Sequence, residues 1–225
     1  MAQLRRKEEL ALNLGEFRAE IPSQVTLIVV TKTFPLSDVE ILYQLGERQF
    51  GENRDDEGRE KSNLMPDDAI WHFQGRIQSK KLRSIVNWSD FIHSLEDLDH
   101  AKKINEIAQE IGKIQKVFLQ INLDEGERSE GRSGIDAKEM FAYVEGLQLL
   151  PSIEVVGLMG IAPLNRDPRP AFEKLAKLSE ELEKLAHSAT YISAGMSGDY
   201  RQALEFGTTH LRIGSSILGT RTGKA

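Results

Sequence analysis

Eight short apolar segments recur along the chain, and a segment with helical periodicity separates nearly every neighbouring pair. A strand followed by a helix, repeated in this way, is typical of parallel strands joined by right-handed crossovers. Eight such units within 225 residues fit a compact (β/α)8 barrel. The segments expected to form strands are 25–32, 49–53, 70–75, 91–95, 116–122, 153–160, 190–196 and 210–214.

A doubly wound open sheet is the competing architecture for an α/β chain. Such a sheet usually carries a glycine fingerprint at its first strand-to-helix turn. Here that turn, 31–35, reads Thr-Lys-Thr-Phe-Pro and contains no glycine. An amphipathic helix is expected at 4–17, before the first strand, and no repeat or linker divides the chain. We therefore expect a single barrel domain over 1–225, with an extra N-terminal helix.

Composition excludes several classes of function. The net charge of −6 argues against general affinity for nucleic acid or for an anionic membrane surface. The absence of cysteine excludes disulfides and thiol nucleophiles and fits a reducing compartment. The five histidines lack metal-ligand spacing. No apolar segment has the form of a signal peptide or the length of a membrane span, so we expect a cytoplasmic protein.

The first strand ends at a lysine. The segment 25–31 is an almost unbroken run of β-branched and aliphatic residues, as in a strand covered on both faces, and Lys32 follows it directly. Desolvation lowers the pKa of a lysine, and a neutral amine can form a Schiff base with a carbonyl group. A lysine that extends into water or pairs with an acid is the commoner explanation for a single strand-end lysine.

Two turns near the C-terminus strengthen the case for a ligand. The segment 195–199 reads Gly-Met-Ser-Gly-Asp and the segment 212–216 reads Arg-Ile-Gly-Ser-Ser, each ahead of an expected helix. The loops after strands seven and eight are the usual phosphate site of such a barrel. Either turn alone would be explained as a helix cap. Together with Lys32 they favour an anionic carbonyl ligand, and pyridoxal phosphate is the obvious candidate.

The order and spacing of several motifs resemble one known family. The motifs are Val-Thr-Lys-Thr at 30–33, Phe-Gly-Glu-Asn at 50–53, Trp-His-Phe-Gln-Gly-Arg-Ile-Gln at 71–78, Gly-Leu-Met at 157–159, Gly-Met-Ser-Gly-Asp at 195–199 and Leu-Arg-Ile-Gly at 211–214. From about residue 10 to 219 the chain is similar to the YggS/PROSC family of pyridoxal phosphate homeostasis proteins, in its short cyanobacterial or bacterial form. The resemblance implies an alanine-racemase-type barrel (fold type III) that buffers or carries pyridoxal 5'-phosphate and indirectly affects the balance of amino acids and keto acids.

The same resemblance implies which residues hold the cofactor. Lys32 would carry it as an internal aldimine, and Arg212 would approach the pyridine nitrogen or the phosphate. The phosphate would lie on Ser197 and on the backbone of Gly214 and Ser215, with Asn53 and Met196 lining the pocket. Gln74 and Arg76 depart from the apolar and leucine-like residues expected there, which should affect packing more than cofactor contacts.

Three functions stay open on the sequence alone. A racemase needs an acid/base opposite the lysine, typically a tyrosine from another domain or subunit, and none of the tyrosines at 43, 143, 191 and 200 lies at a confident strand end. This favours a non-catalytic carrier, with no catalytic residue, over a racemase-like enzyme. An aldolase or phosphosugar isomerase using Lys32 is the third possibility. We expect a monomer whose partners are the cofactor and apo forms of enzymes that use it.

Overall fold

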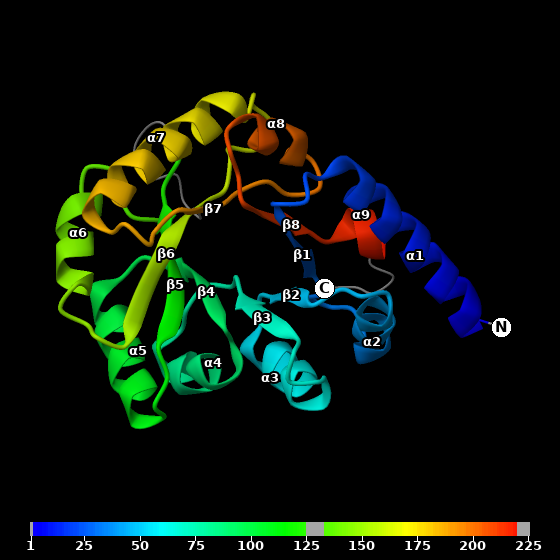
Figure 1. The fold of residues 1–225 in the computed structure, drawn as a ribbon. Coiled ribbons are helices and arrows are strands. Elements are labelled where there is room, and N and C mark those ends of the chain that lie inside the picture. Colours follow the sequence, from blue (N-terminus) through cyan, green and yellow to red (C-terminus); the bar gives the residue numbers. More distant parts are fainter. Residues whose placement is uncertain (1, 125–132, 220–225) are drawn as a thin grey trace.

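The computed structural model describes residues 2–124 and 133–219. Eight parallel strands form a closed barrel in which the strands follow sequence order and β8 pairs with β1 (Figure 1). This confirms the predicted (β/α)8 barrel. The strands are β1 (Thr26–Val30), β2 (Gln49–Glu52), β3 (Ile70–Phe73), β4 (Phe91–Leu95), β5 (Gln115–Ile121), β6 (Ile153–Gly160), β7 (Tyr191–Ser193) and β8 (His210–Ile213).

Helices follow the strands and surround the barrel (Figure 1). They are α2 (Leu36–Gln44), α3 (Asp55–Leu64), the 3-10 helix η1 (Ser79–Lys81), α4 (Leu82–Trp88), α5 (Leu98–Glu110), α6 (Met140–Leu147), α7 (Arg169–Leu185), α8 (Tyr200–Glu205) and α9 (Ser215–Leu218). Most strand bounds lie within one or two residues of those expected.

Two elements are shorter than their sequences indicate. The helix expected from Asp136 begins at Met140. The Asp136 carboxylate accepts a hydrogen bond from the Lys138 backbone N–H at 2.9 Å, which forms a local turn in place of the first helical turn. The strand expected over 190–196 ends at Ser193, because Gly195 has a φ of 91° and bends the chain away from the strand direction.

The apolar interior has two parts. One fills the space between the strands and the helices, and it includes the fully buried Leu42, Ile104 and Leu175. The other lies inside the barrel, where Phe118 and Met159 pack together. Each buried side chain of this size contributes roughly 1.5–3 kcal/mol. The filled interior leaves the carboxyl ends of the strands as the place for a ligand site.

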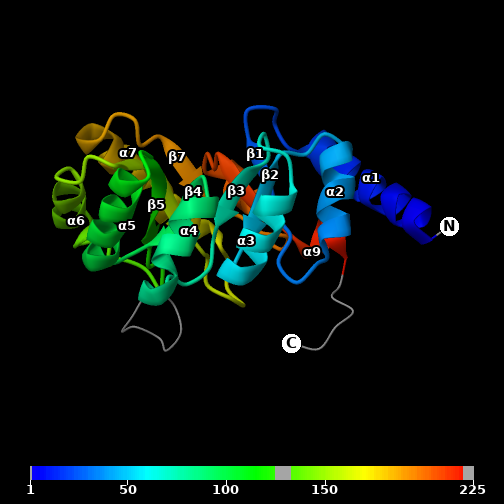
Figure 2. The ribbon, with the colours of Figure 1, turned by 90° about the horizontal axis from the view of Figure 1, so that it is seen from below.

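Helix α1 (Ala2–Glu20) lies outside the ring, beside α2 and α9 (Figures 1 and 2). Arg6 binds the Asp38 carboxylate of α2 through Nη2 at 2.7 Å, and the same nitrogen donates to the Leu218 carbonyl at 2.9 Å. Asn13 Nδ2 donates to the Ile217 carbonyl at 2.9 Å. The N-terminal helix therefore fixes α9, the short helix that follows the last strand.

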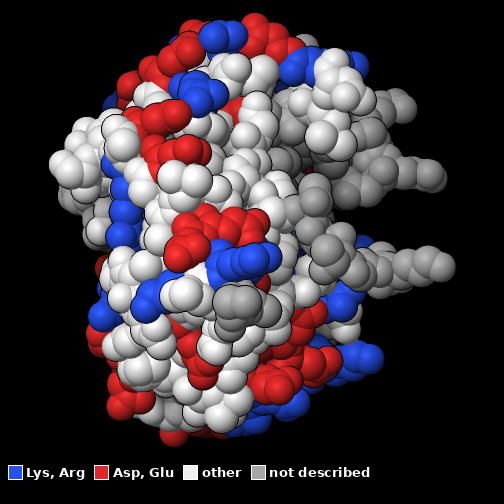
Figure 3. All heavy atoms as spheres, turned by 90° about the vertical axis from the view of Figure 1, so that its right-hand side faces the viewer, with Lys and Arg blue, Asp and Glu red and all other residues white. Residues whose placement is uncertain are grey.

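Acidic and basic side chains are interspersed on the face of the molecule that carries α1 (Figure 3). Such a surface has no extended field of one sign, in keeping with the modest net charge of −6. Among the described residues, no helix is both long and apolar enough to cross a membrane.

Candidate functional site

A cavity of about 330 Å³ lies at the carboxyl ends of the strands. Its lining comes from residues in or beyond the carboxyl ends of β1, β2, β3, β6, β7 and β8, so distant parts of the sequence meet there. All seven residues predicted to bind a cofactor line this single cavity. They are Lys32, Asn53, Met196, Ser197, Arg212, Gly214 and Ser215.

Lys32 lies in a turn just beyond β1, and its half-buried side chain lines the cavity between Val30 and Phe34. The turn is closed by a hydrogen bond of 3.0 Å from the Phe34 backbone N–H to the Thr31 carbonyl. The apolar run of β1 explains this position, because the strand is buried up to Thr31 and the next residue reaches the cavity.

Two serines face each other across the ends of β7 and β8. Ser215 Oγ lies 3.4 Å from Ser197 Oγ, and both hydroxyls belong to the cavity lining. The turn before α8 is held by a hydrogen bond of 2.6 Å from the Met196 N–H to the Asp199 carboxylate. At Gly214, a Cβ atom would lie 3.2 Å from the Val30 carbonyl oxygen, so glycine permits the close approach of this turn to β1. Paired hydroxyls beside small residues suit a phosphate group.

Arg212 supplies a buried cation to the same cavity. Its side chain is 6% exposed and donates through Nη1 to the Ser193 carbonyl at 2.6 Å and to Ser193 Oγ at 2.7 Å, and through Nη2 to the Gly160 carbonyl at 2.9 Å. Burial lowers the pKa of Arg212 to about 10, while Asp199 acts in the opposite direction, so the group stays charged at neutral pH. Of the five N–H donors of a guanidinium, these three bonds leave two for a ligand.

A chain of hydrogen bonds continues from Arg212 into the barrel. Ser193 Oγ lies 2.9 Å from His93 Nδ1, His93 Nε2 lies 2.9 Å from His72 Nδ1, and His72 Nε2 lies 2.7 Å from Gln49 Oε1. Burial lowers the pKa of both histidines well below its ordinary value, so both are neutral. His72 and His93 are thus hydrogen-bonded residues of the barrel core, and both are fully buried.

Unpartnered amide atoms also lie at this site. Asn53 Oδ1 and Gln74 Nε2 are buried and have no hydrogen-bond partner among the described residues, and both side chains belong to the cavity lining. A buried polar atom without a partner calls for an explanation, and a polar ligand supplies one. Gln74 was expected to affect packing more than ligand contacts, but the structure places it in the cavity wall.

Sequence reasoning did not single out the remaining lining residues as cofactor contacts. They are Val30, Phe34, Met159, Ile161, Gly198 and Gly219. They are apolar or small, and in a sequence such residues after a strand look like ordinary packing positions. Except for Gly219, which follows α9, the one feature they share in the sequence is a position near a strand end, and a barrel brings all strand ends to one rim.

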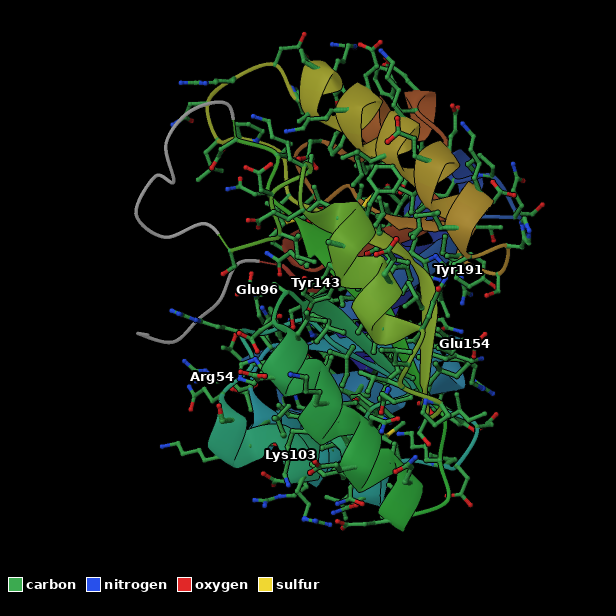
Figure 4. All side chains as sticks on the ribbon, turned by 90° about the vertical axis from the view of Figure 1, so that its left-hand side faces the viewer. Arg54, Glu96, Lys103, Tyr143, Glu154 and Tyr191 are labelled. Atoms are coloured by element: carbon green, nitrogen blue, oxygen red, sulfur yellow. The ribbon has the colours of Figure 1, made fainter. Side chains whose placement is uncertain are left out.

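The tyrosines lie away from the cavity. Tyr43 and Tyr200 donate to Asp68 and Glu20 on the outer surface, and none of the four belongs to the lining. Figure 4 shows Tyr191 and Glu154, near the amino ends of β7 and β6, on the side opposite Arg54 and Glu96, and it shows Tyr143 of α6 near Glu96. Within the described lining, Lys32 and Arg212 are the only residues with ionisable side chains.

The donors and the volume of the cavity fit pyridoxal phosphate, because the lining offers one amine, one guanidinium, two hydroxyls and two amides. Sequence and structure comparisons agree with this. Residues 6–222 match the family model described as alanine racemase, N-terminal domain. The chain is 36% identical to the pyridoxal phosphate homeostasis protein of Synechocystis, over 92% of this chain and 96% of that protein. It is also 36% identical to the protein of the same name from Vibrio alginolyticus, over 89% of this chain and 88% of that protein.

Solved structures give the same result. PipY of Synechococcus elongatus, solved without and with pyridoxal phosphate bound, superposes with TM-scores of 0.88 and 0.86 at 32% identity, over 93% of this chain and all of PipY. An alanine racemase of Clostridium difficile, at 17% identity and a TM-score of 0.80 over 96% of this chain and 58% of the racemase, shares the fold. The resemblance predicted from the motifs is confirmed, and the chain belongs to the family of pyridoxal phosphate homeostasis proteins.

Proposed function

We propose that this chain binds pyridoxal 5'-phosphate in the cavity at the strand ends and serves in the homeostasis of that cofactor as a carrier. The observation that carries the proposal is the meeting of Lys32, Arg212, Ser197 and Ser215 in one cavity. The names of the relatives and the cofactor bound to PipY support it.

Each group of the cavity has a role in this proposal. The Ser197 and Ser215 hydroxyls and the backbone of Gly214 hold the phosphate. The two remaining Arg212 donors bind an acceptor, either the pyridine nitrogen or a phosphate oxygen. The cofactor supplies an aldehyde, and the Lys32 amine attaches to it covalently. Asn53 and Met196 line the pocket beside the ring.

We propose that the protein does not turn over amino acids. Proton transfer on both faces of a bound substrate needs two acid/base groups. Lys32 could serve one face, but the described lining offers only Arg212 as a second ionisable side chain, and a guanidinium with a pKa of about 10 is not a base at neutral pH. A racemase-like enzyme would require a group from outside this cavity.

The proposal extends to the state of the protein in the cell. We propose that residues 1–225 act as one barrel domain, as a monomer in the cytoplasm, and that the bound cofactor passes to apo forms of the enzymes that use it. Size-exclusion chromatography with light scattering tests the monomer. Activation of an added apo-enzyme by the loaded protein, faster than by an equal concentration of free cofactor, tests the transfer.

The experiment that tests cofactor binding is a visible spectrum followed by peptide mapping. The protein should be yellow as purified or after addition of pyridoxal phosphate, and borohydride should fix a phosphopyridoxyl group on Lys32. Lys32→Ala should abolish this label, whereas Lys80→Ala, at an exposed position, should keep it. A colourless protein, as an aldolase or phosphosugar isomerase would be, or a label on another lysine, contradicts the proposal.

A further inference from the structure

The turn that carries Lys32 has an unfavourable backbone. Thr33 has a φ of 68°, and the turn from Thr31 to Phe34 is closed by its own hydrogen bond. A positive φ at the third residue of a turn is the pattern of a type II turn, which normally takes glycine or asparagine there. Threonine is β-branched, so its neighbours must hold this conformation in place.

One such neighbour is Glu57 of α3. The Thr33 backbone N–H donates to Glu57 Oε2 at 2.6 Å. A bond of this length to a carboxylate is stronger than a neutral hydrogen bond. Lys61 Nζ lies 3.8 Å from the same carboxylate, which helps to hold it in place. The bond forms on the residue that directly follows Lys32.

A buried ion pair holds the residue on the other side of Lys32. Lys61 Nζ donates to the Thr31 carbonyl at 2.9 Å and to Glu52 Oε1 at 2.6 Å. Thr31 Oγ1 donates to the same carboxylate oxygen at 2.6 Å. Glu52 is fully buried and Lys61 is 6% exposed. Buried ion pairs are weak evidence of stabilisation, so their placement on this turn needs another reason.

We propose that Glu52, Glu57 and Lys61 are positioning residues that hold the backbone on both sides of Lys32, and thereby place Nζ for reaction with the cofactor aldehyde. We name these three residues the Lys32 clamp. In the reaction, a C=N bond replaces the carbonyl C=O bond, and both N–H protons of the neutral amine leave with the carbonyl oxygen as water. The inference rests on the proposed function, because it needs Lys32 as the point of attachment.

Loss of the clamp should slow the attachment of the cofactor to Lys32 by a factor that can be estimated. If the turn relaxes, Lys32 reaches its reactive position for only a fraction of the time, and the rate of attachment falls by that fraction. Loss of a hydrogen bond to a charged group corresponds to about a tenfold change or more. Ser197, Arg212 and Ser215 lie at β7 and β8, outside the clamp, so a cofactor analogue without an aldehyde should bind as before.

The first test compares variants of α3. Apoprotein is mixed with pyridoxal 5'-phosphate and the attachment is followed by absorbance, while the affinity for pyridoxine 5'-phosphate, which has no aldehyde, is measured by calorimetry. Glu57→Ala should slow attachment about tenfold without a matching loss of pyridoxine 5'-phosphate affinity. Glu57→Gln, which keeps an acceptor oxygen, should lie nearer to the wild type. Glu60→Ala, at an exposed position on the same helix, is the matched control and should leave both quantities unchanged.

The second test is rescue by glycine. Thr33→Gly removes the strain, so Glu57→Ala combined with Thr33→Gly should regain most of the lost rate. Urea unfolding of the same variants separates this from a role in overall stability, because a change of stability alone would leave the attachment rate of the folded protein unchanged. Wild-type attachment in Glu57→Ala, or an equally slow double variant, overturns the inference. Lys61→Met, which keeps an apolar stem, gives a second measurement of the rate if Glu57→Ala does not fold.

The results of these variants distinguish a failure of the clamp inference from a failure of the proposed function. If Lys32→Ala still attaches the cofactor, the proposed function fails at its anchor. If Lys32→Ala abolishes attachment but Glu57→Ala reacts at the wild-type rate, only the clamp fails.

Discussion

The folded protein should lose stability below pH 6.5 because its barrel encloses neutral histidines. His210 is 5% exposed and packs 4.7 Å from the ring of Tyr191 and 5.3 Å from that of Phe118, measured between centroids. Burial, with a smaller effect of Arg212, lowers its pKa from 6.5 to about 4. The pKa values of His72 and His93 are lowered in the same direction by burial.

The sign of the effect follows from proton binding. Above pH 6.5 His210 is neutral in both the folded and the unfolded chain, so it contributes no pH dependence. Between pH 6.5 and about 4 the unfolded chain binds a proton that the folded chain does not, so the free energy of unfolding falls as the pH falls. At pH 5 the difference is 1.5 pH units at roughly 1.4 kcal/mol each, about 2 kcal/mol for this residue. That is a large part of a typical stability of roughly 5–15 kcal/mol.

Urea unfolding at pH 7 and pH 5 measures this directly. The loss of stability between the two pH values should be about 2 kcal/mol smaller in His210→Gln than in the wild type. His187→Gln, at an exposed position, should behave like the wild type. Burial raises the pKa of Glu47 and Glu52, so these two residues change the stability with pH in the direction opposite to His210. They are present in the wild type and in both variants, so their contributions cancel in the comparison. Equal losses in His210→Gln and the wild type would refute the reasoning.

Three further outcomes are expected. Arg212→Ala and Ser197→Ala should each lower the affinity for pyridoxal phosphate by about an order of magnitude or more, measured by equilibrium dialysis, because each removes a polar contact to the anion. The loaded protein should show no racemisation of single amino-acid enantiomers in deuterated water at rates typical of enzymes, and turnover that Lys32→Ala abolishes would contradict the carrier. Gly75→Ala should unfold or strongly destabilise the protein in thermal denaturation, because a Cβ there would lie 1.9 Å from the Asn53 carbonyl oxygen.

The sequence predicted the bounds of those elements that are set by the hydrophobic pattern of their own residues. The strands at 91–95 and 153–160 were expected with the bounds that the structure has. The shorter α6 and β7 depend on the Asp136 turn and on the left-handed conformation of Gly195, which replace regular structure over three or four residues. The barrel itself was predictable because alternation of strands and helices allows few closed arrangements.

The sequence also predicted the composition of the cavity, but not the side-chain network that supports it. Strand ends converge in any such barrel, so listing them is enough to collect the lining. The partners of Arg212 depend on register. Gly160 is 52 residues away, and the bond between His93 and Ser193 joins residues 100 apart. The same holds for the Lys32 clamp, since the bond from Lys61 to Thr31 spans 30 residues and has no local signature.

The direction of the hydrogen bonds that lead from Arg212 into the barrel bears on the proposal that the protein carries a cofactor without catalysing a reaction with it. Gln49 Oε1 can only accept, so His72 donates to it from Nε2 and accepts at Nδ1 from His93. His93 then accepts at Nδ1 from Ser193, whose oxygen accepts from Arg212. Each of these bonds is donated in the direction away from the cavity, from Arg212 towards Gln49. The N–H groups of Arg212 that remain face the cavity, and a guanidinium has no acceptor to offer there. A pyridine nitrogen placed there must accept a hydrogen bond and stays unprotonated, which weakens the ring as an electron sink. A carboxylate in the place of Arg212 would favour the protonated ring instead, and with it chemistry at a bound amino acid.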